Sequence, residues 1–209
     1  LITFHQEDTF MKKNDIKYLI LCGMMMLFIG ITHNADATSV AFPKVEKQGD
    51  GVLYTFEKLP ENAEELRNIA DFSDPKHTTA FFLVALKQYV KDSKSGLEMI
   101  EVLYGPRKIS DFDKHFLKER LSDKKYLPNS YFEGASVDND YTPSEPFQIM
   151  LYDDTHTSEE GYIRVFVHSK GADSRRYLTL RSKGNNWYIW EYPFIVTGIR
   201  LPASQDVWK

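Results

Sequence analysis

The stretch that most constrains the fold of this chain runs from residue 176 to residue 202 and holds two of its three tryptophans. Residues 177–182 alternate between apolar and polar side chains, residues 183–186 read Lys-Gly-Asn-Asn, and residues 187–192 form a dense aromatic run. Alternation, turn residues and aromatic residues in this order are typical of a β-hairpin. We therefore expect two paired strands, the second of which ends before Pro193 because proline cannot donate to a strand ladder.

The two-residue period of a strand sorts the hairpin side chains into two faces. If the turn has an even number of residues, one face carries Leu178, Leu180, Trp187, Ile189 and Glu191. The other face carries Tyr177, Thr179, Arg181, Tyr188, Trp190 and Tyr192. A carboxylate among leucines must be hydrogen-bonded, paired or raised in its pKa, so Glu191 is a candidate general acid or base. The alternative is that Glu191 lies at the strand end, paired with Arg200 or with the backbone.

The face that carries Trp190 could line an apolar pocket with a few polar groups, the usual form of a small-molecule site. A preceding strand adds Arg164, Phe166 and His168 to this face if its register allows. The candidate ligand-binding residues are Arg164, Arg181, Tyr188, Trp190 and Tyr192, and His168 is a second candidate acid or base. The alternative is that these aromatic side chains pack on helices or on a second subunit.

The N-terminal residues predict an upstream extension followed by a secretory signal peptide. Residues 1–10 precede Met11 and are interpreted as non-structural, and after Met11 come three lysines, an apolar run at 18–31 and Ala-Asp-Ala ending at Ala37. The run is shorter than the roughly 20 residues of a membrane-spanning helix. We therefore expect cleavage near Ala37, no stable membrane span afterwards, and an extracellular, periplasmic or cell-surface location. A retained anchor is the alternative.

Residues 38–209 are expected to form a single globular domain. The only cysteine, Cys22, leaves with residues 1–37, and the formal net charge changes only from −4 to −3. This balance argues against nucleic-acid binding, which needs a strong basic excess. Without a disulfide, the domain must be stabilised by its apolar core, which about 170 residues can bury.

Helix signals precede most of the strand signals along residues 38–209. We expect helices at about 60–70, 79–90, 97–104 and 110–122, with the second capped by Ser73 or Asp74. The last helix carries an apolar stripe of Phe112, Phe116, Leu117 and Leu121. Strands are expected at 51–57, 147–152, 162–168 and in the hairpin, with the first at a sheet edge after a polar leader at 38–50. Residues 124–146 form a long irregular connection. This order predicts an α+β fold in which three to four N-terminal helices pack on a C-terminal antiparallel meander.

Several segments together resemble the signature of an uncharacterised bacterial domain family. They are KYLPNSYFEGA at 125–135, GADS at 171–174, LRSKG at 180–184 followed by Trp187, WEY at 190–192 and GIR at 198–200. The resemblance covers roughly residues 55–205 and implies membership of the family but no activity. More distantly, helices followed by a sheet whose late strand reads Gly-Asn-Asn-Trp-Tyr-Ile-Trp are similar to the NTF2-like fold.

The remaining polar clusters match no catalytic or metal motif. The acidic stretch 153–160 has neither EF-hand nor zinc-site spacing, so we expect a solvated loop without a metal. His168, Lys170, Arg175 and Arg176 flank Gly171 and could form a small anion-binding loop or simply a solubilising hairpin end. No nucleophile with a placed base can be assembled, and no cofactor is expected.

Two functions are compatible with these features. The first is an exported, non-catalytic domain that binds a small molecule or a protein partner. The second is an NTF2-like pocket enzyme, of hydrolase or isomerase type, that uses Glu191 or His168 as an acid or base. A closed pocket with two titratable groups within hydrogen-bond reach would favour the enzyme.

Overall fold

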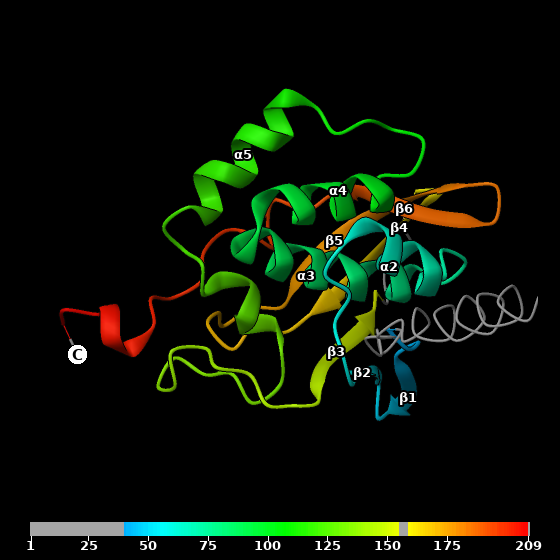
Figure 1. Ribbon diagram of the computed structural model, residues 1–209. Helices are drawn as coiled ribbons and strands as arrows, with labels where there is room; N and C mark the ends of the chain where they lie inside the picture. Colours follow the sequence, from blue (N-terminus) through cyan, green and yellow to red (C-terminus); the bar gives the residue numbers. More distant parts are fainter. Residues whose placement is uncertain (1–39, 155–158, 209) are drawn as a thin grey trace, which may run out of the picture. The chain divides into compact units, whose positions relative to one another are not determined.

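Six antiparallel strands form one sheet within residues 40–154 and 159–208, the parts of the chain that the computed structural model describes. Each strand pairs with the next in the sequence, so the sheet is a meander. The strands are β1 Lys44–Gln48, β2 Gly51–Phe56, β3 Phe147–Asp153, β4 Tyr162–Val167, β5 Arg176–Lys183 and β6 Asn186–Glu191. The predicted hairpin is the β5–β6 pair, orange in Figure 1.

Four α-helices of the described chain lie between β2 and β3 in the sequence, and Figure 1 shows them on one face of the sheet. They are α2 Ala63–Ile69, α3 Pro75–Lys91, α4 Ser93–Leu103 and α5 Asp111–Leu121. The 3₁₀ helix η1 Leu127–Tyr131 follows α5, and a second one, η2 Ala203–Gln205, follows β6. Helices inserted before the C-terminal part of an antiparallel meander confirm the predicted α+β class.

The central helix is α3, which begins at one of the two caps predicted from the sequence. The Asp74 side chain accepts a hydrogen bond from the Lys76 backbone N–H at 2.8 Å, and Pro75 occupies the first turn, where its missing N–H costs nothing. Most of its side chains are buried, because it packs against the sheet on one side and α4 on the other. Phe81 meets the β2 residue Phe56 edge-on, with their ring centroids 5.6 Å apart.

The last helix, α5, starts with a capping box at residue 110, where the sequence predicts the start of a helix. The Ser110 hydroxyl accepts from the Asp113 N–H at 3.1 Å, and the Asp113 carboxylate accepts from the Ser110 N–H at 3.3 Å. Leu117 and Leu121 are buried, but Phe112 is 78% exposed. The apolar stripe predicted for this helix is therefore wrong at its first residue, because only the C-terminal half of α5 reaches the core.

The N-terminal strand β1 corrects two expectations. The polar leader predicted for residues 38–50 contains a strand, and β2, predicted at the sheet edge, lies between β1 and β3. All five β1 side chains are exposed, so the strand has no apolar alternation to reveal it. Backbone pairing with β2 through a turn at Gly49, whose φ is +61°, holds it in place.

The core lies between the helices and one face of the sheet. The inward residues alternate along the strands as Ile149 and Leu151 in β3, Val165 and Val167 in β4, Leu178 and Leu180 in β5, and Ile189 in β6, and each is at most 1% exposed. The first face predicted for the hairpin is therefore confirmed for its aliphatic members. It is wrong for Glu191, which is exposed, because the pairing shifts by one residue between Thr179 and Leu180.

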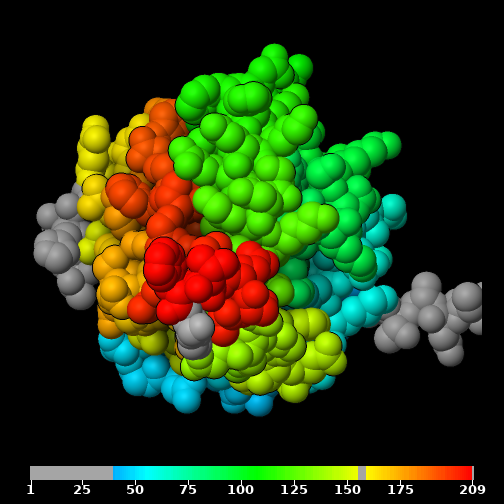
Figure 2. Space-filling view, turned by 90° about the vertical axis from the view of Figure 1, so that its left-hand side faces the viewer, coloured from blue at the N-terminus to red at the C-terminus, as the bar shows by residue number. Residues whose placement is uncertain are grey.

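The long connection after α5 packs against the C-terminal segment. The Ala203 N–H donates to the Val137 carbonyl at 2.9 Å, and the Ser204 N–H donates to the Asp140 carboxylate at 3.0 Å. In Figure 2 the red C-terminal residues lie over the yellow-green segment of this connection. The part of this connection around Val137 and Asp140 is thus held against the end of the chain, while Tyr131, Phe132 and Tyr141 are buried in the core.

Residues 39–209 cluster as one compact unit. The extension and signal peptide predicted for residues 1–37 lie outside the described residues, so the export prediction and the domain boundary stay predictions. Within the described residues, no helix combines the length and apolar character needed to cross a membrane.

Candidate functional site

The sheet face opposite the helices carries most of the residues predicted to bind a ligand. Arg164 of β4 lies opposite Thr179 of β5, and Tyr162 lies opposite Arg181. Residues directly opposite each other share a face, so Arg164 and Arg181 are on the same side as Trp190. The aromatic and cationic side chains predicted from alternation are thus brought together, except for Tyr192.

A pocket of about 450 Å³ lies at the Trp190 end of this face. Three of the predicted ligand-binding residues, Arg181, Tyr188 and Trp190, line it. The other lining residues are Tyr104, Pro106, Arg107, Ser182, Lys183 and Ile189. The pocket therefore forms where the loop after α4 meets the β5–β6 hairpin, and its volume is that of a small-molecule site.

Arg107 holds the loop after α4 against β6. Its guanidinium donates to the carbonyls of Ile189 at 3.3 Å and Trp190 at 3.1 Å, and its Cζ lies 4.7 Å from the Trp190 ring centroid. Gly105 allows the close approach: its φ is +63°, and a Cβ there would lie 2.3 Å from the Tyr188 ring. A larger residue at 105 would push the loop away from the hairpin.

Arg181 approaches the same indole from β5. Its Cζ lies 4.7 Å from the Trp190 ring centroid and 5.3 Å from that of Tyr162, and the side chain is exposed. Tyr162 in turn meets Trp190 edge-on at 5.9 Å. Two guanidinium groups over one indole are each attracted by its negative ring face, and these contacts orient their N–H groups without neutralising their charge.

The pocket has a positive electrostatic character. Arg107, Arg181 and Lys183 line it, and the residues described along its wall include no aspartate or glutamate. The Arg107 Nε is buried and has no hydrogen-bond acceptor among the described residues. Burial raises the pKa of Tyr104 to about 12. The wall thus offers donors and cations to a ligand that would have to supply acceptors.

Arg164 lies outside this pocket, farther along the same face. Its Cζ is 5.1 Å from the Tyr177 ring centroid, and Tyr177 packs against Phe166 and against the 47% exposed Phe194. Apart from Tyr192, the predicted set therefore divides into a pocket group of Arg181, Tyr188 and Trp190 and one arginine, Arg164, farther along the face.

Tyr192 faces the core, which corrects its predicted position. It is 3% exposed and packs against Phe82 at 5.0 Å and Phe116 at 6.2 Å. The register shift that turns Glu191 outward turns Tyr192 inward. Arg200, the partner considered for Glu191, instead pairs with Asp173 at 3.0 Å.

The two candidate acid–base groups lie apart. Glu191 is opposite Thr179, which is opposite Arg164, and His168 is four residues beyond Arg164. Four residues of strand span roughly 13 Å, beyond hydrogen-bond reach. The His168 Nε2 also accepts a hydrogen bond from the Arg175 Nε at 2.9 Å. Burial and the neighbouring Arg175 and Lys170 lower the pKa of His168, so the ring is neutral at pH 7.

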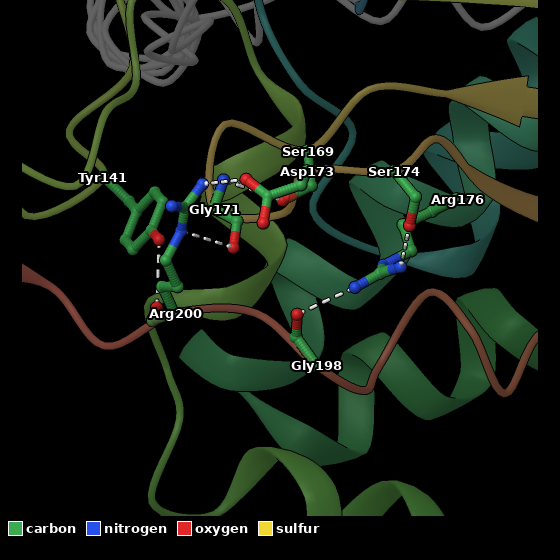
Figure 3. Close-up of polar contacts among 8 residues, drawn as sticks. All are labelled: Tyr141, Ser169, Gly171, Asp173, Ser174, Arg176, Gly198 and Arg200. Atoms are coloured by element: carbon green, nitrogen blue, oxygen red, sulfur yellow. Dashed lines mark hydrogen bonds and ion pairs between the residues drawn. The ribbon is translucent and has the colours of Figure 1, made fainter.

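The loop around Gly171 uses its cations within the fold. Lys170 pairs with Glu133 at 2.8 Å, Arg175 reaches His168 and Asp50, and Arg176 donates to Ser174 and to the Gly198 carbonyl, each at 2.8 Å. Figure 3 shows the Arg176 contacts beside those of Arg200 with Asp173 and the Gly171 carbonyl. The geometry favours a structural role over the anion-binding loop considered from the sequence.

The described residues contain no group of three or more His, Cys, Asp and Glu side chains placed to hold a metal ion. Residues 155–158 of the acidic stretch lie outside that set. Its described member Asp153 pairs with Lys76 at 2.6 Å.

Sequence reasoning missed the part of the pocket supplied by residues 104–107. The sequence predicts only that a helix ends near residue 104, and Arg107 follows three residues later, after Gly105 and Pro106. The available signal was a helix end at a glycine, followed closely by an arginine. Nothing local in the sequence shows that the arginine binds the Trp190 carbonyl, more than 80 residues away.

Comparison with known proteins identifies the family of the chain. No curated protein and no solved structure matches it, so the distant NTF2-like resemblance gains no support. The model of one family matches residues 58–203, which is more than half of the chain and includes both the helical layer and the hairpin. The chain therefore belongs to the family described as a domain of unknown function, DUF6935.

Proposed function

We propose that this domain is a non-catalytic binding protein whose pocket at Trp190 takes a small anionic ligand with a flat or apolar body. The observation that carries the proposal is the pair of guanidinium groups, Arg107 and Arg181, over one indole in a pocket whose described lining has no carboxylate.

Each part of the wall has a role in this binding. Arg181 is exposed and can turn its planar fork toward a carboxylate or phosphate, with which it forms two parallel hydrogen bonds. Trp190 and Tyr188 offer apolar ring surface to the body of the ligand. Arg107 is tied to two backbone carbonyls, so it supplies a fixed positive charge.

The enzyme hypothesis has less support. It needs an acid and a base close together in one pocket, and neither Glu191 nor His168 lines the pocket at Trp190. A binding function needs only the aromatic and cationic side chains that do line this pocket.

An exported location remains part of the proposal, on the basis of the signal-peptide pattern at residues 11–37. Sequencing the N-terminus of the protein recovered from culture medium or envelope tests it, with Thr38 expected as the first residue and an intact Met11 contradicting it.

Calorimetric titration of the full-length chain tests the pocket. The probes are 4-hydroxybenzoate, inorganic phosphate and the uncharged 4-hydroxybenzamide. We expect the aromatic carboxylate to bind, the amide not to bind, and the affinity to fall with added salt. Because a hydrogen bond to a charged group contributes about 1.5–3 kcal/mol, Arg181→Gln should weaken binding about tenfold or more.

Arg164→Gln is the matched control. Arg164 is an exposed arginine of the same sheet face that also lies over an aromatic ring, but it does not line the pocket. Binding should be unchanged in this variant. Equal losses in the two variants, or binding that survives Arg181→Gln, would refute the pocket as the site.

A further inference from the structure

A second pocket, of about 420 Å³, lies where α3 passes η1 and the start of β3. It shares no lining residue with the pocket at Trp190. Its apolar wall includes Leu59, Val84 and Val90. One α3 side chain in this pocket, Lys87, contacts an amide and two aromatic rings. Lysines such as Lys91 and Lys170 contact carboxylates instead.

Lys87 is half-buried and has no carboxylate partner within ion-pair distance among the described residues. Its Nζ donates to the Asn129 side-chain oxygen at 2.7 Å, and it lies 5.6 Å and 5.2 Å from the ring centroids of Phe132 and Phe147. Lys91, one turn later and in the same pocket, pairs with Glu61 at 2.7 Å. Two lysines of one helix thus reach one pocket, one with a carboxylate partner and one without.

The pKa of the Lys87 amine is lower than that of an exposed lysine. Burial lowers the pKa of Lys87, the nearby Glu145 opposes this effect, and Lys91 adds to it. The charged groups that line the pocket are Glu57, Lys58, Glu61, Lys87, Lys91 and Glu145. Removing an ammonium group from water without a counter-ion disfavours its charged form, and the neutral amine is the nucleophilic form of lysine.

We propose that Lys87 is a carbonyl-reactive amine and that its pocket takes a small aldehyde or ketone as a Schiff base. The amine nitrogen forms a bond to the carbonyl carbon as the C=O π bond breaks, and a proton moves from nitrogen to oxygen to give a carbinolamine. The hydroxyl then takes up a proton from the solvent. The C–O bond breaks, water leaves and the iminium remains.

The pocket suits this product in size and polarity. Its volume accommodates a small organic molecule, and Leu59, Val84 and Val90 offer apolar surface to the body of that molecule. The amide of Asn129 holds the amine in place without giving it a counter-charge. The site involves none of the residues of the anion pocket, so either proposal can fail alone.

Reductive trapping tests the inference. The full-length protein is treated with propanal and cyanoborohydride near pH 7, and modified lysines are located by peptide mapping over time. Lys91 is the internal control in the same pocket, and Lys114, on the surface of α5, is an exposed control. We expect Lys87 to be alkylated several times faster than both. An equal or slower rate at Lys87 overturns the proposal, and this comparison needs no substitution.

Two variants separate charge from access. Asn129→Asp places a carboxylate against the amine, which should hold it charged and reduce its labelling rate to that of Lys91. Asn129→Ala removes the same hydrogen bond without adding charge, so labelling should stay fast. Labelling of Lys87 that is equally fast in both variants, with melting temperatures near that of the unmodified chain, would refute the role given to its electrostatic surroundings.

Discussion

Thr179 lies opposite Glu191 across the β5–β6 ladder, although its neighbour Leu180 lies opposite Ile189. One extra residue, Trp190, therefore stands in β6 between the two pairs, which is a β-bulge. Because strand side chains alternate with a period of two, the bulge reverses the faces of the residues after it. Glu191 faces solvent and Tyr192 faces the core for this reason.

The bulge predicts opposite sensitivities at two adjacent positions. Tyr192→Ala should lower the free energy of unfolding by about 3–5 kcal/mol, because it removes a buried ring packed against Phe82 and Phe116. Glu191→Gln should change it by less than about 0.5 kcal/mol. Urea denaturation of both variants checks this, and uninterrupted alternation would give the reverse order.

Gly171 should tolerate alanine poorly. A Cβ at this position would lie 2.1 Å from the Tyr141 hydroxyl and 2.6 Å from an Ile199 methyl group, so Gly171→Ala should cost about 1–3 kcal/mol through overpacking. In a double-mutant cycle with Tyr141→Phe, which removes the nearest atom, the cost of the alanine should fall. Strictly additive effects would show that the hydroxyl is not the obstacle.

Two buried tyrosine hydroxyls should respond differently to removal. The Tyr131 hydroxyl donates to the Ile195 carbonyl at 2.6 Å, whereas the buried Tyr126 hydroxyl has no partner among the described residues. Tyr131→Phe leaves a buried carbonyl unsatisfied and should cost about 1–3 kcal/mol. Tyr126→Phe should be neutral or slightly stabilising. Thermal unfolding of the two variants side by side tests the difference, which equal costs would contradict.

The stability of the fold should decrease in mild acid. Burial lowers the pKa of His77, against the opposing charges of Asp71 and Asp74, so the unfolded chain binds a proton more readily than the folded one. The contribution of neutral His77 to the free energy of unfolding is therefore fully present above the unfolded histidine pKa of about 6.5. It is lost as the pH falls from there through the lower pKa of the folded state. His168, whose pKa burial also lowers, acts in the same direction.

His77→Phe isolates the contribution of this residue. The ring of His77 stacks on Phe81 at 4.9 Å, so phenylalanine keeps the stacking and removes the titration. We expect the drop in melting temperature between about pH 7.5 and about pH 5.5 to be smaller in the variant than in the unmodified chain. A drop of the same size in both would assign the acid sensitivity to other groups.

The sequence by itself determined the elements whose signals are local. The capping box at Ser110 and Asp113, the Asp74-Pro75 start of α3 and the alternation in β3, β4 and β5 each act within a few residues, so their patterns predicted the helices and strands that form. The same patterns predicted the α+β class and most of the open sheet face. The quoted segments also predicted an uncharacterised family, which the match at residues 58–203 confirms.

Only the tertiary structure decided the features that depend on backbone pairing between distant segments. The five exposed residues of β1 carry no apolar pattern, so only pairing with β2 makes them a strand. The bulge at Trp190 is a property of two strands in register, and one residue of shift moved Glu191 out of the core and Tyr192 into it. Arg107 joined the pocket because its guanidinium meets carbonyls more than 80 residues away, which no local pattern encodes. Side-chain periodicity records which face a residue prefers, and the pairing of backbones fixes which face it has.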